Sequence, residues 1–476
     1  MASFMLNSAR VTGFLSNAGN HFTFNGVRAL STSCRHEAAK TKKSLAKQNV
    51  KNIVLVEGVR TPFLMSGTEY KDLMPHDLQR EAMKGLIERT SIPKDSVDHI
   101  VVGTVIQEVK TSNVAREAAL EAGFSDRVPA HTVTMACISS NQAITSGMGM
   151  LASGQADTII AGGVDFMSDA PIRHSRQMRK FMLNLGKAKT AGAKMSLASR
   201  HLSMAALAPE LPAVAEFSSN ESMGHSADRL AAAFGVSRQE QDDYSIRSHT
   251  LADKATKEGL LTDRLTYIVP KTGKAVEADN GIRPSSEAQM ARLKPAFIKP
   301  HGTITAANAS FLSDGASACL IMTEEKALAM GYKPKAYLRD YVYVAQDPTD
   351  QLLLGPAYSI PKVLARSGLT LDDIDVFEIH EAFAGQILAN LNALGSDYWC
   401  QNFLGAKSKL GAIPMDKMNL WGGSLSIGHP FGATGVRLAT TSANRLEKED
   451  GQFAVLAACA AGGHGHAMVV ERYPSS

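Results

Sequence analysis

The sequence has little cysteine, little net charge and no long apolar run, and each shortage excludes a class of protein. Five cysteines among 476 residues are too few for a disulfide scaffold, and none forms the C-x-x-C pair of a common zinc site. We therefore expect no metal. The formal net charge of +4 is too small to indicate a nucleic-acid partner. No stretch approaches the roughly 18 apolar residues of a bilayer-spanning helix.

The remaining composition is that of a soluble enzyme. Hydrophobic residues make up 44% of the chain and charged residues 20%, which excludes a disordered or fibrous protein. The length is sufficient for two or three domains.

Acidic residues are missing from two segments, the first of which is the N-terminus. No Asp or Glu precedes Glu37, whereas arginines and serines recur among scattered apolar residues. This composition is typical of a mitochondrial presequence, and the continuous apolar stretch of a bacterial signal peptide is absent. We predict a presequence over residues 1–33, with a disordered tail as the alternative.

The second acid-free segment lies in the middle of the chain. From Ala170 to Pro209 there are eight Lys or Arg residues and no acid. Apolar side chains at helical spacing predict two helices separated by a turn, one with Met178, Phe181, Met182 and Leu185 and one with Leu197, His201, Met204 and Leu207. Such a basic amphipathic hairpin, within an insertion at 173–222, suits an anionic membrane surface. Packing on the protein itself or on a partner subunit is an equally weighted alternative.

A pattern of strand, loop, helix and strand occurs once in each half of the remaining chain. Strands are predicted at 52–57, 99–105, up to 135, 158–161, 336–342, 374–379 and 453–457, and helices at 77–89, 139–153 and up to 446. The repetition predicts an α/β fold with two similar halves and covered sheets.

The predicted halves are interrupted by the basic segment, which sets the domain boundaries. We place the first half at 50–170 together with 295–325, and the second at 330–476. A loop domain that includes the basic helical hairpin is predicted at 171–294.

Three segments, two of them rich in glycine, carry the side chains that can do chemistry. They are T-M-A-C-I-S-S-N with Cys137, S-I-G-H-P-F-G-A-T-G with His429, and A-A-C-A-A-G-G-H-G with Cys459. Two thiols and one imidazole supply a nucleophile, a base that ionises it and a second acid or base. Chemistry that makes or breaks a carbon–carbon bond beside a thioester needs this set, whereas a hydrolase needs one thiol.

Each of these side chains has a predicted setting. Cys137 precedes a helix, whose N-terminus is expected to favour the thiolate. His429 lies in a tight loop and can take the thiol proton and then donate to an oxyanion. Cys459 ends a buried strand, and a thiol near its ordinary pKa of about 8.5 suits proton exchange with a substrate carbon. Cys319 and Cys400 are predicted to be core residues.

A fourth segment, E-I-H-E-A-F-A, places His380 and Glu381 at the end of a strand. Two polar groups among apolar neighbours indicate a cleft. No histidine stands four residues after His380, so a two-histidine metal site is not implied. His464 and His466, which follow Cys459, are predicted to be structural.

These motifs resemble the thiolase superfamily over nearly the whole chain, from about Asn52 to Glu471. The resemblance rests on the nucleophilic cysteine, the G-H-P-x-G-x-x-G loop, the C-x-G-G-G loop and the N-E-A-F segment, present here as H-E-A-F from His380. It implies the duplicated thiolase fold and a 3-ketoacyl-CoA thiolase, with CoA as co-substrate and no permanently bound cofactor. The H-E-A-F histidine, the basic insertion and the presequence resemble the mitochondrial members that shorten long-chain substrates in fatty-acid β-oxidation.

The resemblance also implies partners. These are 3-oxoacyl-CoA and CoA, a second copy in a homodimer core, an α subunit with hydratase and dehydrogenase activities, and peripheral contact with the matrix side of the inner mitochondrial membrane.

The same resemblance implies a role for each motif residue. Cys137 would carry the acyl group, His429 would activate it, and Cys459 would protonate the departing acetyl-CoA enolate. His380 and His429 would shape one oxyanion site, and the backbone N–H groups of Cys137 and Ala461 would form the other.

Two positions depart from the family pattern. Ala461 replaces the first glycine after Cys459, which keeps the N–H group and adds a methyl group. His380 replaces an asparagine, giving a cysteine and two histidines, as in ketoacyl synthases. The alternatives are an acetoacetyl-CoA-type thiolase, a condensing synthase, which lacks the Cys459 thiol, and a catalytically silent acyl-CoA or lipid carrier, against which the intact Cys137, His429 and Cys459 argue.

Overall fold

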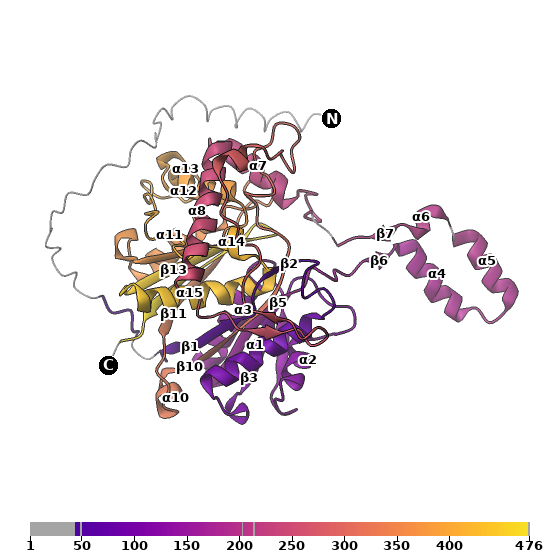
Figure 1. Cartoon of the computed structure of the whole chain (residues 1–476), viewed down its shortest axis with the longest axis horizontal. Helices are drawn as coiled ribbons and strands as arrows, with labels where there is room; N and C mark the ends of the chain where they lie inside the picture. The colour runs from indigo at the N-terminus through magenta and orange to yellow at the C-terminus, as the bar shows by residue number, and fades with distance from the viewer. Residues whose placement is uncertain (1–42, 48–49, 202, 213–214, 475–476) are drawn as a thin grey trace. The chain divides into compact units, whose positions relative to one another are not determined.

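The chain folds into two α/β halves that share one ten-stranded sheet, shown in the computed structural model of Figure 1. The structure describes residues 43–47, 50–201, 203–212 and 215–474. The predicted presequence and Cys34 lie outside these residues. All elements described below belong to the compact unit Lys47–Ser476.

The strands follow the order β12-β13-β14-β11-β1-β10-β5-β3-β4, and β2 (Leu64–Met65) pairs with β10 beside this path. The first half supplies β1 (Ile53–Arg60), β3 (His99–Gly103), β4 (Ala130–Val133), β5 (Thr158–Asp165) and β10 (Ser313–Thr323). The second half supplies β11 (Ala336–Ala345), β12 (Val376–Ile379), β13 (Phe453–Ala460) and β14 (His464–Arg472).

The two halves repeat one pairing pattern. In each, the first strand pairs antiparallel with the last, and the last pairs antiparallel with the strand before it. That strand then pairs parallel with an earlier one. The predicted duplication is therefore confirmed. The halves join where β1 pairs with β11 through Val54–Tyr337 and Leu55–Ala336, a junction that the sequence did not predict.

Helices cover the sheet and fill the space between the halves. The main ones are α1 (Pro75–Thr90), α2 (Val114–Glu121), α3 (Ser139–Ala152), α11 (Gly355–Ser367), α12 (Ala384–Leu394) and α15 (Thr434–Lys448). Apolar side chains of α1 and α2 pack on the first half in one core cluster. A second cluster joins Met148 of α3 and Val436 of α15 to Ile321 of the first half and Leu456 of the second. The two central helices, α3 and α15, thus pack between the halves, and this packing positions their N-terminal ends.

The long helix α8 (Arg238–Lys257) and several shorter elements complete the fold. The shorter ones are α7 (Met223–Ala233), α9 (Glu287–Ala291), α10 (Glu324–Ala329), α13 (Asp397–Phe403), α14 (Ser424–Ile427), β8 (Tyr267–Ile268), β9 (Ala275–Val276) and the 3-10 turns η2 (Lys94–Ser96), η3 (Leu371–Asp373) and η4 (Phe431–Ala433). Cys319 in β10 and Cys400 in α13 are fully buried, which confirms that both are core residues.

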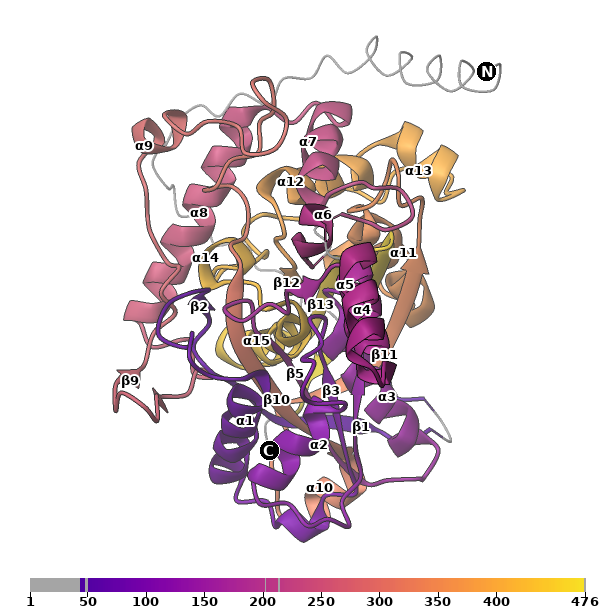
Figure 2. The same cartoon turned by 90° about the vertical axis from the view of Figure 1, so that its right-hand side faces the viewer.

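The predicted basic hairpin is present. It consists of α4 (Arg176–Lys187), α5 (Ala191–His201) and α6 (Met204–Leu207), with β6 (Arg173–His174) pairing with β7 (Pro209–Glu210) at its base. Helices α4 and α5 lie side by side (Figures 1 and 2). The Arg179 guanidinium is 2.6 Å from the Glu210 carboxylate, the first acid after the basic run.

The predicted apolar face of α4 is only partly correct. Met178 and Phe181 are buried, but Met182 is 50% exposed and its neighbour Leu183 is 69% exposed. The predicted second helix is wrong as one element, because its residues are divided between α5 and α6. Met204 and Leu207 of α6 are also exposed, and the side chain of His201 lies outside the described part of the chain. Among the helices that the structure describes, none has the length and hydropathy needed to cross a membrane.

Candidate active site

Cys137 lies in a tight turn between β4 and α3. The residue before it, Ala136, has a φ of 47°, in the left-handed region that costs a residue with a side chain conformational energy. Ser139 closes the turn, because its Oγ accepts from the Met135 N–H at 2.8 Å and donates to the Ala136 carbonyl at 2.6 Å. The thiol is thus held just ahead of α3, as the sequence predicted.

The start of α3 packs against the loop that carries His429. The Val436 N–H donates to Ser140 Oγ at 3.1 Å, and a Cβ atom at Gly435 would lie 2.2 Å from the Asn141 side chain. Only glycine permits this approach of the two helices. The loop is also tied to the sheet, since the Gly432 N–H donates to the Asp165 carboxylate at the end of β5. Burial raises the pKa of that carboxyl to about 6.

His380 and His429 meet in the interior. Their ring centroids are 4.1 Å apart, and the side chains are 0% and 3% exposed. His380 Nδ1 is 2.9 Å from Ser424 Oγ, and His429 Nδ1 is 2.7 Å from Thr434 Oγ1. Neither Nε2 atom has a hydrogen-bond partner among the described residues. Two buried imidazoles therefore each keep one nitrogen available.

Cys459 lies beside Cys137. It is buried at the end of β13, and the charge of a Cys137 thiolate raises the pKa of Cys459 further. The Ala461 backbone N–H lowers the pKa of the Cys137 thiol, against the larger raising effect of burial, and Gly462 and Gly463 follow with positive φ. The structure thus brings Cys137, Cys459 and Ala461 together, and brings His380 to His429, but no imidazole is hydrogen-bonded to a thiol in the described part of the chain.

Burial changes the expected protonation states. It raises the pKa of the Cys137 thiol to about 12, against the lowering effect of the Ala461 N–H. It lowers the pKa of His429 to about 3, with a further lowering by the charge of Arg437. The expectation that the helix start produces a thiolate is therefore wrong for the resting site. A neutral thiol and a neutral imidazole coexist there, and a thiolate forms only when the proton moves to a base.

The expectation for Cys459 also needs correction. Burial raises the pKa of its thiol well above the ordinary value near 8.5. Cys459 therefore holds its proton firmly until a stronger base, such as a carbanion, is placed beside it.

Glu381 is an anchor and does not line a cleft, so that expectation is wrong for this residue. Its buried carboxylate accepts from Tyr244 Oη at 2.9 Å, Ser248 Oγ at 2.8 Å and Asn419 Nδ2 at 2.7 Å. A Cβ atom at Gly423 would lie 2.2 Å from it. Glu381 thus fixes the segment that leads into the His429 loop. His466, predicted to be structural, is fully buried, with its ring centroid 4.7 Å from that of Tyr343.

Sequence reasoning missed several polar residues around the histidines. Arg437 of α15 is 1% exposed and donates to Ser424 Oγ at 3.2 Å. An arginine inside the predicted helix ending at 446 was a visible signal, whereas Ser424 and Thr434 carried none. Glu216, from the end of the insertion, accepts from the Gly462 N–H at 2.8 Å and has no recognisable motif.

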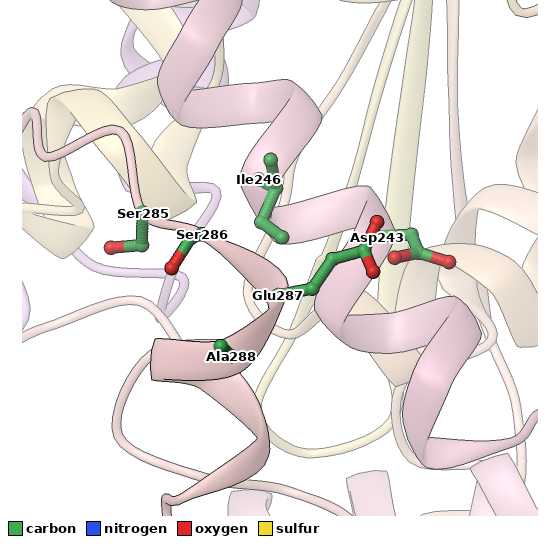
Figure 3. Close-up of a pocket in the computed structure, with 6 residues that line it drawn as sticks. All are labelled: Asp243, Ile246, Ser285, Ser286, Glu287 and Ala288. Atoms are coloured by element: carbon green, nitrogen blue, oxygen red, sulfur yellow. The ribbon is translucent and has the colours of Figure 1, made fainter.

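Two other features lie apart from these residues. An open depression of about 580 Å³ is lined by Asp243, Ile246 and residues 285–288, none of which belongs to the motifs (Figure 3). Within the described ranges, His76, Asp77 and Glu121 have metal-like spacing. The Arg80 guanidinium lies 2.9 Å from both of these carboxylates. Its positive charge therefore already stands where a metal ion would be needed.

Known protein families match both halves of the chain. Residues 53–325 match the family model for the thiolase N-terminal domain, and residues 332–472 match that for the thiolase C-terminal domain.

Relatives agree with the family models. The chain is 67% identical over 453 residues to the bovine (Bos taurus) mitochondrial trifunctional enzyme subunit beta, covering 94% of this chain and 95% of that protein. It is 64% identical over 448 residues to a probable 3-ketoacyl-CoA thiolase of Caenorhabditis elegans, covering 94% and 99%. The crystal structure of human mitochondrial 3-ketoacyl-CoA thiolase in complex with CoA superposes with a TM-score of 0.74 at 27% identity, covering 89% and 98%.

Proposed function

The chain belongs to the thiolase family, and on that premise we propose that it is a 3-ketoacyl-CoA thiolase whose Cys137 carries the acyl group. It is an acyltransferase of fatty-acid β-oxidation, like the relatives that bear this name. The residue assignment is supported by two pairs drawn from four segments far apart in the sequence, Cys137 with Cys459 and His380 with His429. The helix that follows Cys137 is hydrogen-bonded to the helix that follows His429.

The first half-reaction breaks a carbon–carbon bond. His429 Nε2 takes the proton of the Cys137 thiol, and the sulfur attacks the 3-keto carbon of the substrate. The C2–C3 bond then breaks, the acyl group stays on Cys137, and the electron pair passes to the acetyl-CoA enolate. Cys459 gives its proton to C2 of that enolate and becomes a thiolate. A thiol with a raised pKa suits this step, because only a carbanion-like base removes its proton.

The second half-reaction transfers the acyl group to CoA. The Cys459 thiolate takes the proton of the CoA thiol, which attacks the acyl carbonyl on Cys137. The Cys137 sulfur leaves and recovers its proton from His429, and an acyl-CoA shortened by two carbons departs. The Ala461 N–H, which lowers the pKa of the Cys137 thiol, would donate to the oxyanion on the acyl carbon, together with the Cys137 N–H. The cycle balances in protons and predicts ping-pong kinetics.

The relatives extend this reading to location and partners. The chain is mitochondrial, as its relatives are, and CoA is a substrate, as in the CoA complex of the human thiolase. The name of the bovine relative implies an α subunit as partner. We also propose a homodimer core and long-chain substrates, both from the resemblance of the motifs to the mitochondrial members of the family.

The basic hairpin supports a further proposal, peripheral binding to the matrix side of the inner mitochondrial membrane. Lys180, Lys187 and Lys194 are exposed on α4 and α5, close in sequence to the exposed apolar side chains of Met182 and Leu183. Cations beside unburied apolar groups suit an anionic lipid surface. Contact with the α subunit through the same hairpin is the competing possibility.

The reaction is tested by trapping the acyl group. We expect intact-mass spectrometry to find an acyl adduct after the full chain meets a sixteen-carbon 3-ketoacyl-CoA without free CoA, and to find none for Cys137→Ala. Cys400→Ala, which removes a buried thiol outside the site, should label as the wild type does. An adduct on Cys137→Ala would contradict the assignment. Equal kcat/KM for four-carbon and sixteen-carbon substrates would contradict the chain-length proposal, for which at least about a tenfold difference is expected.

A further inference from the structure

The two buried histidines differ in what their Nδ1 atoms contact. We propose that Ser424, held by Arg437, and Thr434 impose opposite tautomers on His380 and His429. His380 then carries its proton on Nε2 and is a hydrogen-bond donor, while His429 carries its proton on Nδ1 and is a proton acceptor at Nε2. The inference rests on the proposed function for its consequence in catalysis, but the tautomers themselves follow from the hydrogen bonds.

Ser424 determines the His380 tautomer. Its Oγ has two polar neighbours, Arg437 Nη2 at 3.2 Å and His380 Nδ1 at 2.9 Å. A guanidinium can only donate, so Ser424 Oγ accepts from Arg437. The hydroxyl hydrogen then has one acceptor within reach, the lone pair of His380 Nδ1. The reverse arrangement would leave a fully buried hydroxyl hydrogen without an acceptor, which folded proteins rarely tolerate.

Thr434 determines the His429 tautomer in the opposite sense. Its Oγ1 lies 2.7 Å from His429 Nδ1 and donates to the Pro430 carbonyl at 3.2 Å, four residues back along the chain. With the hydroxyl hydrogen directed at that carbonyl, Oγ1 accepts a hydrogen bond from His429 Nδ1–H. This arrangement makes two hydrogen bonds, whereas a hydroxyl that donates to Nδ1 would make one.

The remaining nitrogens then face the chemistry with different properties. Both Nε2 atoms are buried without a hydrogen-bond partner among the residues that the structure describes, and their ring centroids are 4.1 Å apart. His429 Nε2 offers a lone pair to the Cys137 thiol, and His380 Nε2–H offers a donor to the enolate oxygen. Once His429 has taken the thiol proton, its Nε2–H becomes a second donor. The pair therefore needs unlike tautomers at rest.

Arg437 is suited to hold this arrangement. The Glu378 carboxylate lies 3.7 Å from Arg437 Nη1 and 2.8 Å from Arg445 Nη1, so the Arg437 guanidinium is oriented from the side away from Ser424. Its positive charge also lowers the pKa of both His380 and His429. Both imidazoles stay neutral. Only a neutral imidazole has two tautomers, because a charged ring carries a proton on each nitrogen.

The tautomers can be measured without any assay of activity. The full chain labelled with ¹⁵N-histidine should show His380 with an unprotonated Nδ1 and His429 with an unprotonated Nε2, each resonance being identified by its loss in His380→Asn or His429→Asn. In Ser424→Ala the His380 signals should change to those of a mixture of tautomers. Equal tautomers on the two residues, or unchanged His380 signals in Ser424→Ala, would overturn the proposal.

The effect on the reaction separates a positioning role from a merely structural one. We expect Ser424→Ala to lower kcat about tenfold, the loss of about 1.4 kcal/mol, with KM changed less than about twofold. In a His380→Asn background the same substitution should change kcat less than about twofold, because Ser424 acts through His380. Ser359→Ala, which removes a buried hydroxyl that contacts the His466 carbonyl, should match the wild type.

The outcomes distinguish this proposal from the proposed function. An equal fall of kcat in both backgrounds would show a structural role for Ser424 and overturn the inference while thiolysis stands. If the wild type showed the expected tautomers but no thiolysis, the proposed function would fail and the tautomer assignment would stand.

Discussion

At the scale of the residue, the second thiol is the part that separates this site from a hydrolase. We predict that Cys459→Ser lowers kcat for thiolysis by about 10²–10³-fold, because a serine hydroxyl exchanges protons with carbon far less readily than a thiol does. The same variant should lose exchange of the acetyl-CoA methyl protons in D₂O, followed by NMR. Cys400→Ser is the matched control, since that thiol contacts the Ala393 and Leu394 carbonyls, which a hydroxyl can also do. Methyl exchange at the wild-type rate in Cys459→Ser would contradict the role of this thiol.

Single residues also show what a sequence can and cannot reveal. Glycines beside His429 and Cys459, and small residues beside Cys137, mark close approaches of the backbone, so the motifs could be recognised without a structure. The protonation states of their side chains could not be recognised in this way. The pKa of a thiol depends on how completely other segments bury it, and Cys459 is buried by parts of the chain far from position 459. Ser424 was missed for the same reason, since its partner Arg437 is thirteen positions away.

At the scale of the element, the basic hairpin carries the next prediction. Replacing Lys180, Lys187 and Lys194 with Gln should weaken binding to cardiolipin-containing vesicles by about a hundredfold, because each lysine near an anionic surface contributes about 1 kcal/mol. Co-sedimentation of the full chain measures this, and raised salt should weaken wild-type binding through screening. Replacing the same lysines with Arg keeps the charge and should leave binding unchanged. Equal binding of the Gln and wild-type proteins would favour docking on the α subunit.

The hairpin illustrates the limit of periodicity as a predictor. Apolar spacing placed both helices near their observed positions, because an amphipathic helix must cover one apolar face. It did not reveal how wide the covered stripe is. Met178 and Phe181 are covered within the short hairpin, and Met182, on the same predicted face, is left half-exposed. Burial at a given position depends on the partner surface, which periodicity does not describe.

At the scale of the whole molecule, the duplication was predictable and the joining of the halves was not. Repeated strand, loop, helix and strand segments follow from local propensity and pattern. The β1–β11 pairing and the burial of α3 beside α15 bring together residues about three hundred positions apart, such as Ser140 and Val436. These long-range contacts create a deep interior, and that interior holds several neutral imidazoles.

Buried imidazoles predict that the fold loses stability in acid. Burial lowers the pKa of His429 and His466 to about 3 and that of His249 to about 4, and it lowers the pKa of His380 as well. In the unfolded chain each imidazole has an ordinary pKa near 6.5, so below that pH the unfolded state binds more protons. Stability is therefore full above about pH 6.5 and falls toward pH 4. Asp165, whose pKa is raised to about 6, opposes the trend below that pH.

His466→Phe isolates the contribution of one imidazole. The substituted ring keeps the aromatic contact with Tyr343 and cannot bind a proton, while Asp165 and the other histidines are the same in both proteins. Between pH 7.5 and 5, wild-type stability should fall by about 2 kcal/mol more than that of the variant, since each pH unit below 6.5 costs about 1.36 kcal/mol for a buried neutral histidine. The melting temperature at fixed protein concentration measures the difference, and His301→Gln, at an exposed position, controls for the loss of a histidine. If the stabilities of the wild type and of His466→Phe fell by the same amount as the pH is lowered, His466 would take up no extra proton on unfolding.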